Sequence, residues 1–159
     1  MDLDHECIEE FQTQLKKGKI QKGYKSLLEY LLYLQSYLRK RYEDYDFTGT
    51  FYHGYLDMSY FAFITPALKE HRLKVAIVFN YKTFQFELWL SGYNKDIQKK
   101  YWEYFKKKNI KGYFLPETIK GYDSIVEDHI EEDSLDVIAT TALIEERIKR
   151  FIKTIEENL

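Results

Sequence analysis

The stretch LKVAIVFNYKTFQFELWLS, residues 73–91, decides the fold of this chain. Residues 73–80 and 83–91 are rich in β-branched and aromatic side chains, and in the second run apolar residues alternate with polar ones. This pattern predicts two β-strands. Because the link between them is short, we expect an antiparallel hairpin with Tyr81 and Lys82 at its tip.

One face of this expected hairpin is apolar throughout. With that tip, Leu73 lies opposite Leu90 and Val75 lies opposite Leu88. A slip by one residue would bring polar side chains into this face, so the hydrophobic pattern specifies which face is buried. We therefore expect helices to cover it.

The other face of the hairpin is half polar and carries Lys74, Glu87 and Trp89. In the same register Glu87 lies opposite Ala76 and diagonal to Lys74, within reach of a long side chain. The carboxylate is then either one half of a solvated ion pair, which contributes little to stability, or part of a binding site.

Helical patterns flank the hairpin in the sequence on both sides. The expected helices cover residues 4–17, 22–42, 95–108 with Asn94 as N-cap, 123–131, and a long stretch from an N-cap at Ser134 to Asn158. The period changes in residues 48–65, which predict a first strand bent at Gly54. Residues 111–117 predict a short extended piece.

Because strands and helices segregate along the chain, the expected fold is α+β. It consists of an antiparallel sheet of about three strands, with helices packed on one face, two N-terminal helices and a long C-terminal helix. A chain of 159 residues with only 7 Gly and 2 Pro shows no linker, so we expect one domain over residues 1–159.

The aromatic content points to a binding surface. Aromatic residues make up 18% of the chain, with 15 Tyr and 11 Phe, and a small domain seldom buries so many. Some of them should therefore lie on a surface that binds a ligand, a protein partner or a second copy of the chain.

Polar residues on the expected strands form the candidate site. His53, Tyr55 and Asp57 share one parity, so they would project from one face of the strand 48–65. If that face continues into the one with Glu87 and Trp89, the five side chains would share a concave surface for a small polar ligand. Lys74 would be the charge partner. The alternative to a ligand site is an ordinary solvent-exposed sheet face with half-buried polar residues.

Two other functions remain open from the residues, and a third is disfavoured. Asp57 and Glu87 could hold a metal in a hydrolase or nuclease-like domain, although Glu87 is followed by Leu88 and Trp89, so Trp89 stands where an E-x-K motif needs its lysine. Exposed aromatics could instead make a homodimer. Nucleic-acid binding is disfavoured, because the formal charge is −2 and the Lys-rich helix 95–108 is followed by an acidic stretch.

Several classes of site and location lack their signatures. The sequence contains no glycine-rich phosphate loop, HExxH, paired CxxC or GxSxG, so we expect no cofactor and no catalytic residue. No apolar run approaches the roughly 20 residues of a membrane span. An acidic N-terminus and the single Cys7 favour a cytoplasmic location.

Three segments of the chain resemble a family of small uncharacterised bacterial proteins, grouped as a domain of unknown function. They are LKVAIVFNYKTFQFELWLSGYNKDIQKKYW (73–102), YLDMSYFAF (55–63) and IQKGYKSLLEYLLYL (20–34), and the resemblance spans nearly the whole chain. It implies a cytosolic, stand-alone domain and carries no activity, substrate or catalytic residue.

Overall fold

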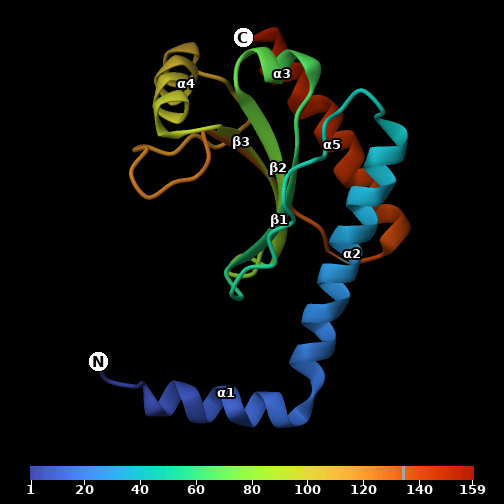
Figure 1. The fold of residues 1–159 in the computed structure, drawn as a ribbon, viewed down its shortest axis with the longest axis vertical. Helices are drawn as coiled ribbons and strands as arrows, with labels where there is room; N and C mark the ends of the chain where they lie inside the picture. Colours follow the sequence, from blue (N-terminus) through green and yellow to red (C-terminus); the bar gives the residue numbers. More distant parts are fainter. Residues whose placement is uncertain (134) are drawn as a thin grey trace.

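The computed structural model describes residues 1–133 and 135–159, and this part of the chain forms an α+β fold with four strands and five helices (Figure 1). In chain order the elements are α1 (His5–Lys17), α2 (Lys19–Arg41), β1 (Met58–Phe63), α3 (Pro66–Glu70), β2 (Leu73–Asn80), β3 (Gln85–Gly92), α4 (Lys95–Lys108), β4 (Val126–Ile130) and α5 (Val137–Glu157).

The sheet has the order β1-β2-β3-β4, and each strand is antiparallel to the next. The α+β class and the antiparallel hairpin are confirmed, but the expectation of about three strands missed β4. Residues 123–131, expected as a short helix, instead contribute this strand. Its acidic residues hid the period-2 pattern, in which Val126 and Ile130 face the core.

The hairpin register differs by two positions from the expected one. Val75 pairs with Leu90 and Ile77 with Leu88, because the turn contains four residues, 81–84, rather than two. Its last residue, Phe84, has φ 56° and so lies outside the strand. An even shift keeps every side chain on its expected face.

The register moves Lys74 away from Glu87, and the expected diagonal pair is wrong. Lys74 lies opposite Ser91, whereas Glu87 lies opposite Val78. Four positions along a strand amount to about 13 Å.

The first strand is shorter than expected, because only residues 58–63 of 48–65 are extended in the sheet. Gly54 and Leu56 both have positive φ, 80° and 64°, which turns the chain before β1 begins. A Cβ on Gly54 would lie 1.8 Å from the carbonyl oxygen of Met58, so this turn requires glycine. The expected extended piece at 111–117 makes only an isolated bridge between Phe114 and Glu127.

The apolar sheet face carries the core. Helices α2 and α5 lie on the same side of the sheet and cover this face, as expected (Figure 1). Buried side chains from both layers meet there, among them Leu34, Phe61, Ile77, Leu88 and Phe151.

Helix α4 follows β3 and lies apart from α2, towards the β3 side of the sheet (Figure 1). Its buried Tyr101 and Phe105 belong to the same hydrophobic core as α5. Tyr104 OH donates a hydrogen bond to the Asn158 carbonyl at 2.5 Å.

The position of α4 is fixed at its start, where Gly92 approaches Gln98 so closely that a Cβ would come within 2.6 Å of the Gln98 nitrogen. The N-cap prediction is confirmed, since Asn94 Oδ1 accepts a hydrogen bond from the Ile97 N–H at 2.9 Å.

We expect Asn94→Ala to lower the free energy of unfolding by about 1 kcal/mol, because one N–H of the first turn loses its acceptor. Urea unfolding followed by circular dichroism measures this change. The neighbouring exposed Lys95→Ala is the control and should change stability little. An Asn94→Ala variant as stable as the wild type would show that water satisfies the helix start equally well.

Helix α5 begins at Val137, and its N-cap is Asp136, which accepts a hydrogen bond from the Ala139 N–H at 2.8 Å. The expected cap, Ser134, lies outside the described residues. Near the middle of α5, Glu145 accepts hydrogen bonds from Tyr37, Arg41 and Tyr42, which joins this helix to the end of α2.

Helix α1 stands apart from the rest of the fold. The chain turns at Gly18, which has φ 73°, and α1 then runs at a steep angle to α2, beneath the hairpin end of the sheet (Figure 1). None of its residues is buried. Among the described residues, no helix combines the length and the apolar character that a membrane crossing requires.

Candidate ligand-binding site

A cavity of about 390 Å³ opens on the half-polar face of the sheet, and we call it the half-polar cavity. Its floor comes from β3 and β4, and its rim from the β2–β3 turn and the segment 114–124. The lining contains polar residues and aromatic rings, namely Asn80, Lys82, Thr83, Glu87, Trp89, Phe114, Tyr122, Asp123, Ser124, Glu127 and His129, together with Met58 and Gly121.

Glu87 lines the cavity and is only 2% exposed. Its Oε2 accepts a hydrogen bond from Trp89 Nε1 at 2.8 Å. Its Oε1 accepts longer bonds from Asn80 Nδ2 and Thr83 Oγ1, both at 3.3 Å. Glu87 is therefore a buried carboxylate held by neutral donors, and the interpretation as a solvated pair with Lys74 is wrong.

Strand β4 supplies a second carboxylate and an imidazole. The register places His129 opposite Glu87 and Glu127 opposite Trp89, so all four side chains share one face. Glu127 is 6% exposed, and its Oε1 accepts a hydrogen bond from Ser124 Oγ at 2.5 Å. Its Oε2 lies 2.6 Å from His129 Nε2, a hydrogen-bonded carboxylate–imidazole pair.

Ligand atoms of Glu87, Glu127 and His129 all lie within 4.8 Å of one another. Carboxylate oxygen and imidazole nitrogen are ordinary ligands of divalent metals such as Zn²⁺. All three residues line the half-polar cavity. The group could therefore hold a metal ion that keeps one position open.

Aromatic rings form the walls of the cavity. Phe114 stacks on the His129 ring with centroids 5.5 Å apart and lies 6.3 Å from the Tyr122 ring. Phe114 and Tyr122 are each about two-fifths exposed, at 41% and 42%. Ring faces next to carboxylates attract a cation, because the ring quadrupole and the negative charges act in the same direction.

Of the six residues expected in the site, only Glu87 and Trp89 line this cavity. Lys74 lies towards the other end of β2, opposite Ser91. His53, Tyr55 and Asp57 lie in the turn before β1, so they do not project together from a strand face. Their expected meeting with Glu87 depended on a strand that the chain does not form there.

The turn before β1 has a structural explanation of its own. Asp57 Oδ1 accepts a hydrogen bond from the Tyr55 N–H at 2.8 Å, and backbone hydrogen bonds from Tyr55 and Met58 lower the pKa of the Asp57 carboxyl. The Tyr55 side chain is 90% exposed. The His53 carbonyl accepts a hydrogen bond from Tyr24 OH at 2.9 Å, while its ring packs on Phe51. These contacts stabilise the turn.

Glu127, His129 and Ser124 are the site residues that the sequence did not reveal. The missed signal is the period of two in residues 126–130, which places Glu127 and His129 on one face and Val126 and Ile130 on the other. Four acids from Glu127 to Glu132 made the segment resemble a solvated helix.

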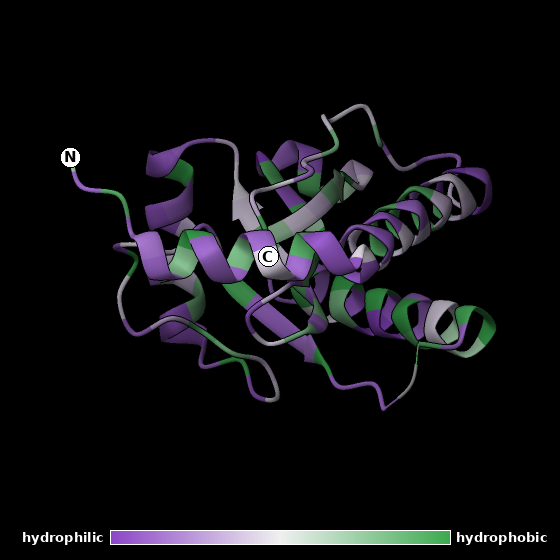
Figure 2. Cartoon of the chain, turned by 90° about the horizontal axis from the view of Figure 1, so that it is seen from below, coloured by the Kyte–Doolittle hydropathy of each residue, from purple (hydrophilic) through white to green (hydrophobic). Residues whose placement is uncertain are grey.

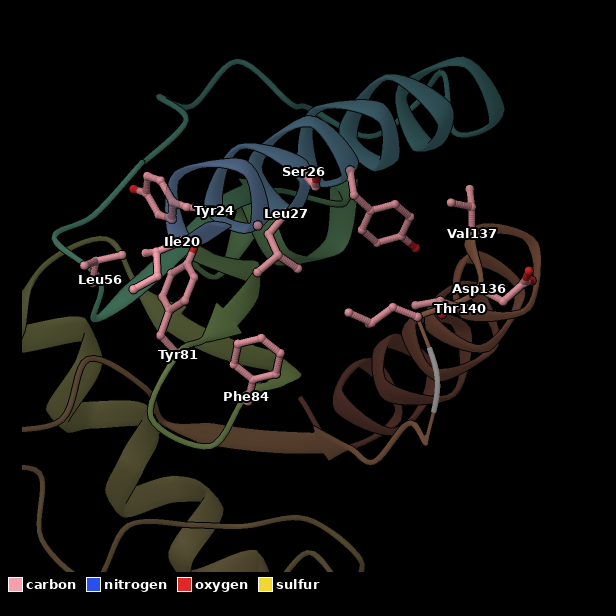
Figure 3. A pocket seen from close by; sticks show the side chains of 13 residues that line it. Ile20, Tyr24, Ser26, Leu27, Leu56, Tyr81, Phe84, Asp136, Val137 and Thr140 are labelled. Atoms are coloured by element: carbon pink, nitrogen blue, oxygen red, sulfur yellow. The ribbon is translucent and has the colours of Figure 1, made fainter. Parts of the chain in front are cut away.

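A second hollow, of about 530 Å³, lies between the first half of α2, the β2–β3 turn and the start of α5 (Figure 3). We call it the apolar groove. Its walls are mainly hydrophobic and aromatic, with Ile20, Leu27, Tyr81, Phe84 and Val137 pointing into it. Among the described residues, its lining contains a single carboxylate, that of Asp136, in place of the pair in the half-polar cavity.

The comparisons with known proteins give a family and no activity. A family model described as a domain of unknown function (DUF7000) matches residues 3–159, nearly the whole chain. Comparison with curated proteins and with solved structures gave no significant match.

Proposed function

The chain belongs to the DUF7000 family, a domain of unknown function, so the family supplies no activity. From the half-polar cavity we propose that the chain is a binding domain for a small, positively charged ligand. We keep the cytoplasm as its proposed location, since the single Cys7 is free.

The observation that carries this proposal is the pair of buried carboxylates, Glu87 and Glu127, on one cavity wall. Removing a carboxylate from water is costly unless a positive charge or hydrogen bonds compensate for it. Within residues 1–133 and 135–159, neither group makes an ion pair with a lysine or arginine; their recorded partners are neutral donors and His129. A bound cation would add a positive charge that the neutral donors around Glu87 do not supply.

The walls favour an organic cation in particular. An ammonium or guanidinium group could reach the Glu87 carboxylate while its alkyl part lies against Trp89 and Phe114. Cation–π attraction of about 0.5–2 kcal/mol would add to the charge–charge attraction. A cavity of about 390 Å³ lies within the usual size range of small-molecule sites.

We expect Glu87→Gln to weaken binding of the cation about 10- to 100-fold, the usual effect of losing a charge-assisted hydrogen bond. The amide keeps the shape of the side chain, so the melting temperature without ligand should change little. A thermal-shift panel of ethylammonium, tetramethylammonium, guanidinium, Mg²⁺, Mn²⁺ and Zn²⁺ identifies the cation, and calorimetry then compares the variants.

Glu103→Gln is the matched control, because Glu103 is an exposed residue of α4 outside the cavity. It should bind the same cation as tightly as the wild type. A panel with no stabilising cation, or equal affinity in Glu87→Gln and the wild type, would refute the proposed function.

A divalent metal is the second candidate ligand, favoured by the short mutual distances of Glu87, Glu127 and His129. The metal would take the place of the proton between His129 and Glu127. A metal-dependent hydrolase would then use these three residues, since Asp57 lies outside the cavity. In the same panel, His129→Ala separates the candidates, because it removes a metal ligand and leaves both carboxylates for an organic cation.

A further inference from the structure

Helix α1 carries an apolar stripe that the described chain leaves open to solvent. Ile8 is 47% exposed and Phe11 is 53% exposed, and Leu15 continues the same face one turn later. Figure 2, seen from below, shows α1 crossing the front of the molecule with hydrophobic bands between hydrophilic ones. An isolated helix of 13 residues is marginal in water, so α1 needs a partner surface.

The apolar groove has a shape suited to such a partner. On its α2 side it presents Ile20, Tyr24 and Leu27, which recur at helical spacing (Figure 3). Gly23 lies among them, and a Cβ built there would meet nothing within 4 Å. The groove is therefore open at its helical wall, and a second helix can approach closely there.

Charges are segregated along the same part of the chain. The first ten residues hold five acids and no lysine, namely Asp2, Asp4, Glu6, Glu9 and Glu10. Residues 11–28 hold five lysines and no acid, namely Lys16, Lys17, Lys19, Lys22 and Lys25. Of these charges, the ion pairs recorded for the described residues include only Lys25, which lies 3.7 Å from Glu29 in an exposed pair.

From these observations we propose that the chain forms a homodimer through its N-terminal arm, residues 1–28. The two arms run antiparallel about a two-fold axis, and α1 of each copy lies in the apolar groove of the other. This arrangement places the acidic half of each arm beside the lysines of the other arm. The two-fold axis repeats this contact, as a self-complementary interface requires. A parallel arrangement would set like charges against each other.

The charge balance favours a second copy over a membrane surface. Helices that bind anionic lipid carry Lys and Arg along their polar face. Here the exposed apolar residues Ile8 and Phe11 are flanked by Glu6, Glu9 and Glu10, which anionic headgroups would repel. Five acids against five lysines also leave the arm with no net charge to attract nucleic acid.

Sedimentation equilibrium over a range of concentrations tests the dimer. We expect the wild type to dimerise, and the triple variant Glu6→Lys/Glu9→Lys/Glu10→Lys to show a dissociation constant at least tenfold higher. The triple variant Lys19→Glu/Lys22→Glu/Lys25→Glu should show the same loss. An equimolar mixture of the two should form a heterodimer, because each acidic half then meets a basic one.

Two further variants make the test specific. Gly23→Trp fills the groove and should abolish dimerisation, while circular dichroism should show an intact fold, because the site is open. Glu103→Lys changes an exposed residue of α4 and should dimerise like the wild type. A monomeric wild type, including one that binds lipid vesicles, would overturn the proposal, and so would charge-reversed or Gly23→Trp variants that dimerise normally.

Discussion

Replacing Phe79 with alanine should lower the free energy of unfolding by about 3–5 kcal/mol, the usual cost of removing a fully buried aromatic ring. Phe79 is 0% exposed and lies on the core face of β2. Its ring centroid lies 4.9 Å from that of Phe86 and 5.1 Å from those of Tyr81 and Phe84. Loss of this ring leaves a cavity and removes contacts with three other rings.

Urea unfolding, followed by both fluorescence and circular dichroism, measures this change. Phe84→Ala is a matched control, since Phe84 belongs to the same cluster but is 61% exposed. It should cost much less than Phe79→Ala. Equal effects of the two substitutions would contradict this prediction, because the exposed ring of Phe84 would then stabilise the fold as much as the buried ring of Phe79.

Replacing Glu145 with alanine should lower the free energy of unfolding by about 2–3 kcal/mol, because three hydrogen bonds lose their charged acceptor. Glu145 Oε1 accepts from Tyr42 OH at 2.7 Å and from Arg41 Nε at 2.9 Å, and Oε2 accepts from Tyr37 OH at 2.9 Å. The Glu145 side chain is 9% exposed and that of Arg41 is 52% exposed, so water weakens part of the network.

The same network predicts how stability changes with pH. Burial is the largest single influence and raises the pKa of the Glu145 carboxyl, but hydrogen bonds from Tyr42, Arg41 and Tyr37 together outweigh it, so the pKa lies below its ordinary value. The ionised group therefore stabilises the fold above the ordinary carboxyl pKa of about 4.3, and this contribution is lost as the pH falls through the lowered value.

Comparison of the wild type with Glu145→Gln between pH 7 and pH 3 checks this sign. The stability difference between them should be greatest near neutral pH and should shrink in acid. Exposed Glu146→Gln, one residue further along α5, is the control and should follow the wild type closely at every pH. A difference that grows in acid would contradict the lowered pKa.

The sequence predicts the faces of the hairpin well, because a period of two depends only on which residues are apolar. Leu88 and Leu90 point to the core and Glu87 and Trp89 point away from it, as expected. The register could not be predicted, since it depends on Phe84 adopting φ 56° and lengthening the turn. The expected tip, Tyr81 and Lys82, has no residue pair typical of a two-residue turn.

The candidate site could be predicted only in part, for a related reason. Glu87 and Trp89 were identified because they lie on a strong strand pattern. Glu127 and His129 were missed because a five-residue strand with two adjacent acids, Glu127 and Asp128, looks solvated until its partner strand is known. Asp128 is in fact 3% exposed and pairs with Arg147 of α5, so a long-range contact decides the local structure.

The strand order β1-β2-β3-β4 has a consequence for the route of folding. Every pairing in this meander joins strands that follow one another in the chain, so each closes a modest loop, whereas the contact of Glu145 with Tyr37 spans 108 residues. Loop-closure entropy grows with the logarithm of the intervening length. We therefore expect strands β3 and β4, which form the floor of the half-polar cavity, to pair early in folding. The packing of α5 against α2 should form later and more slowly.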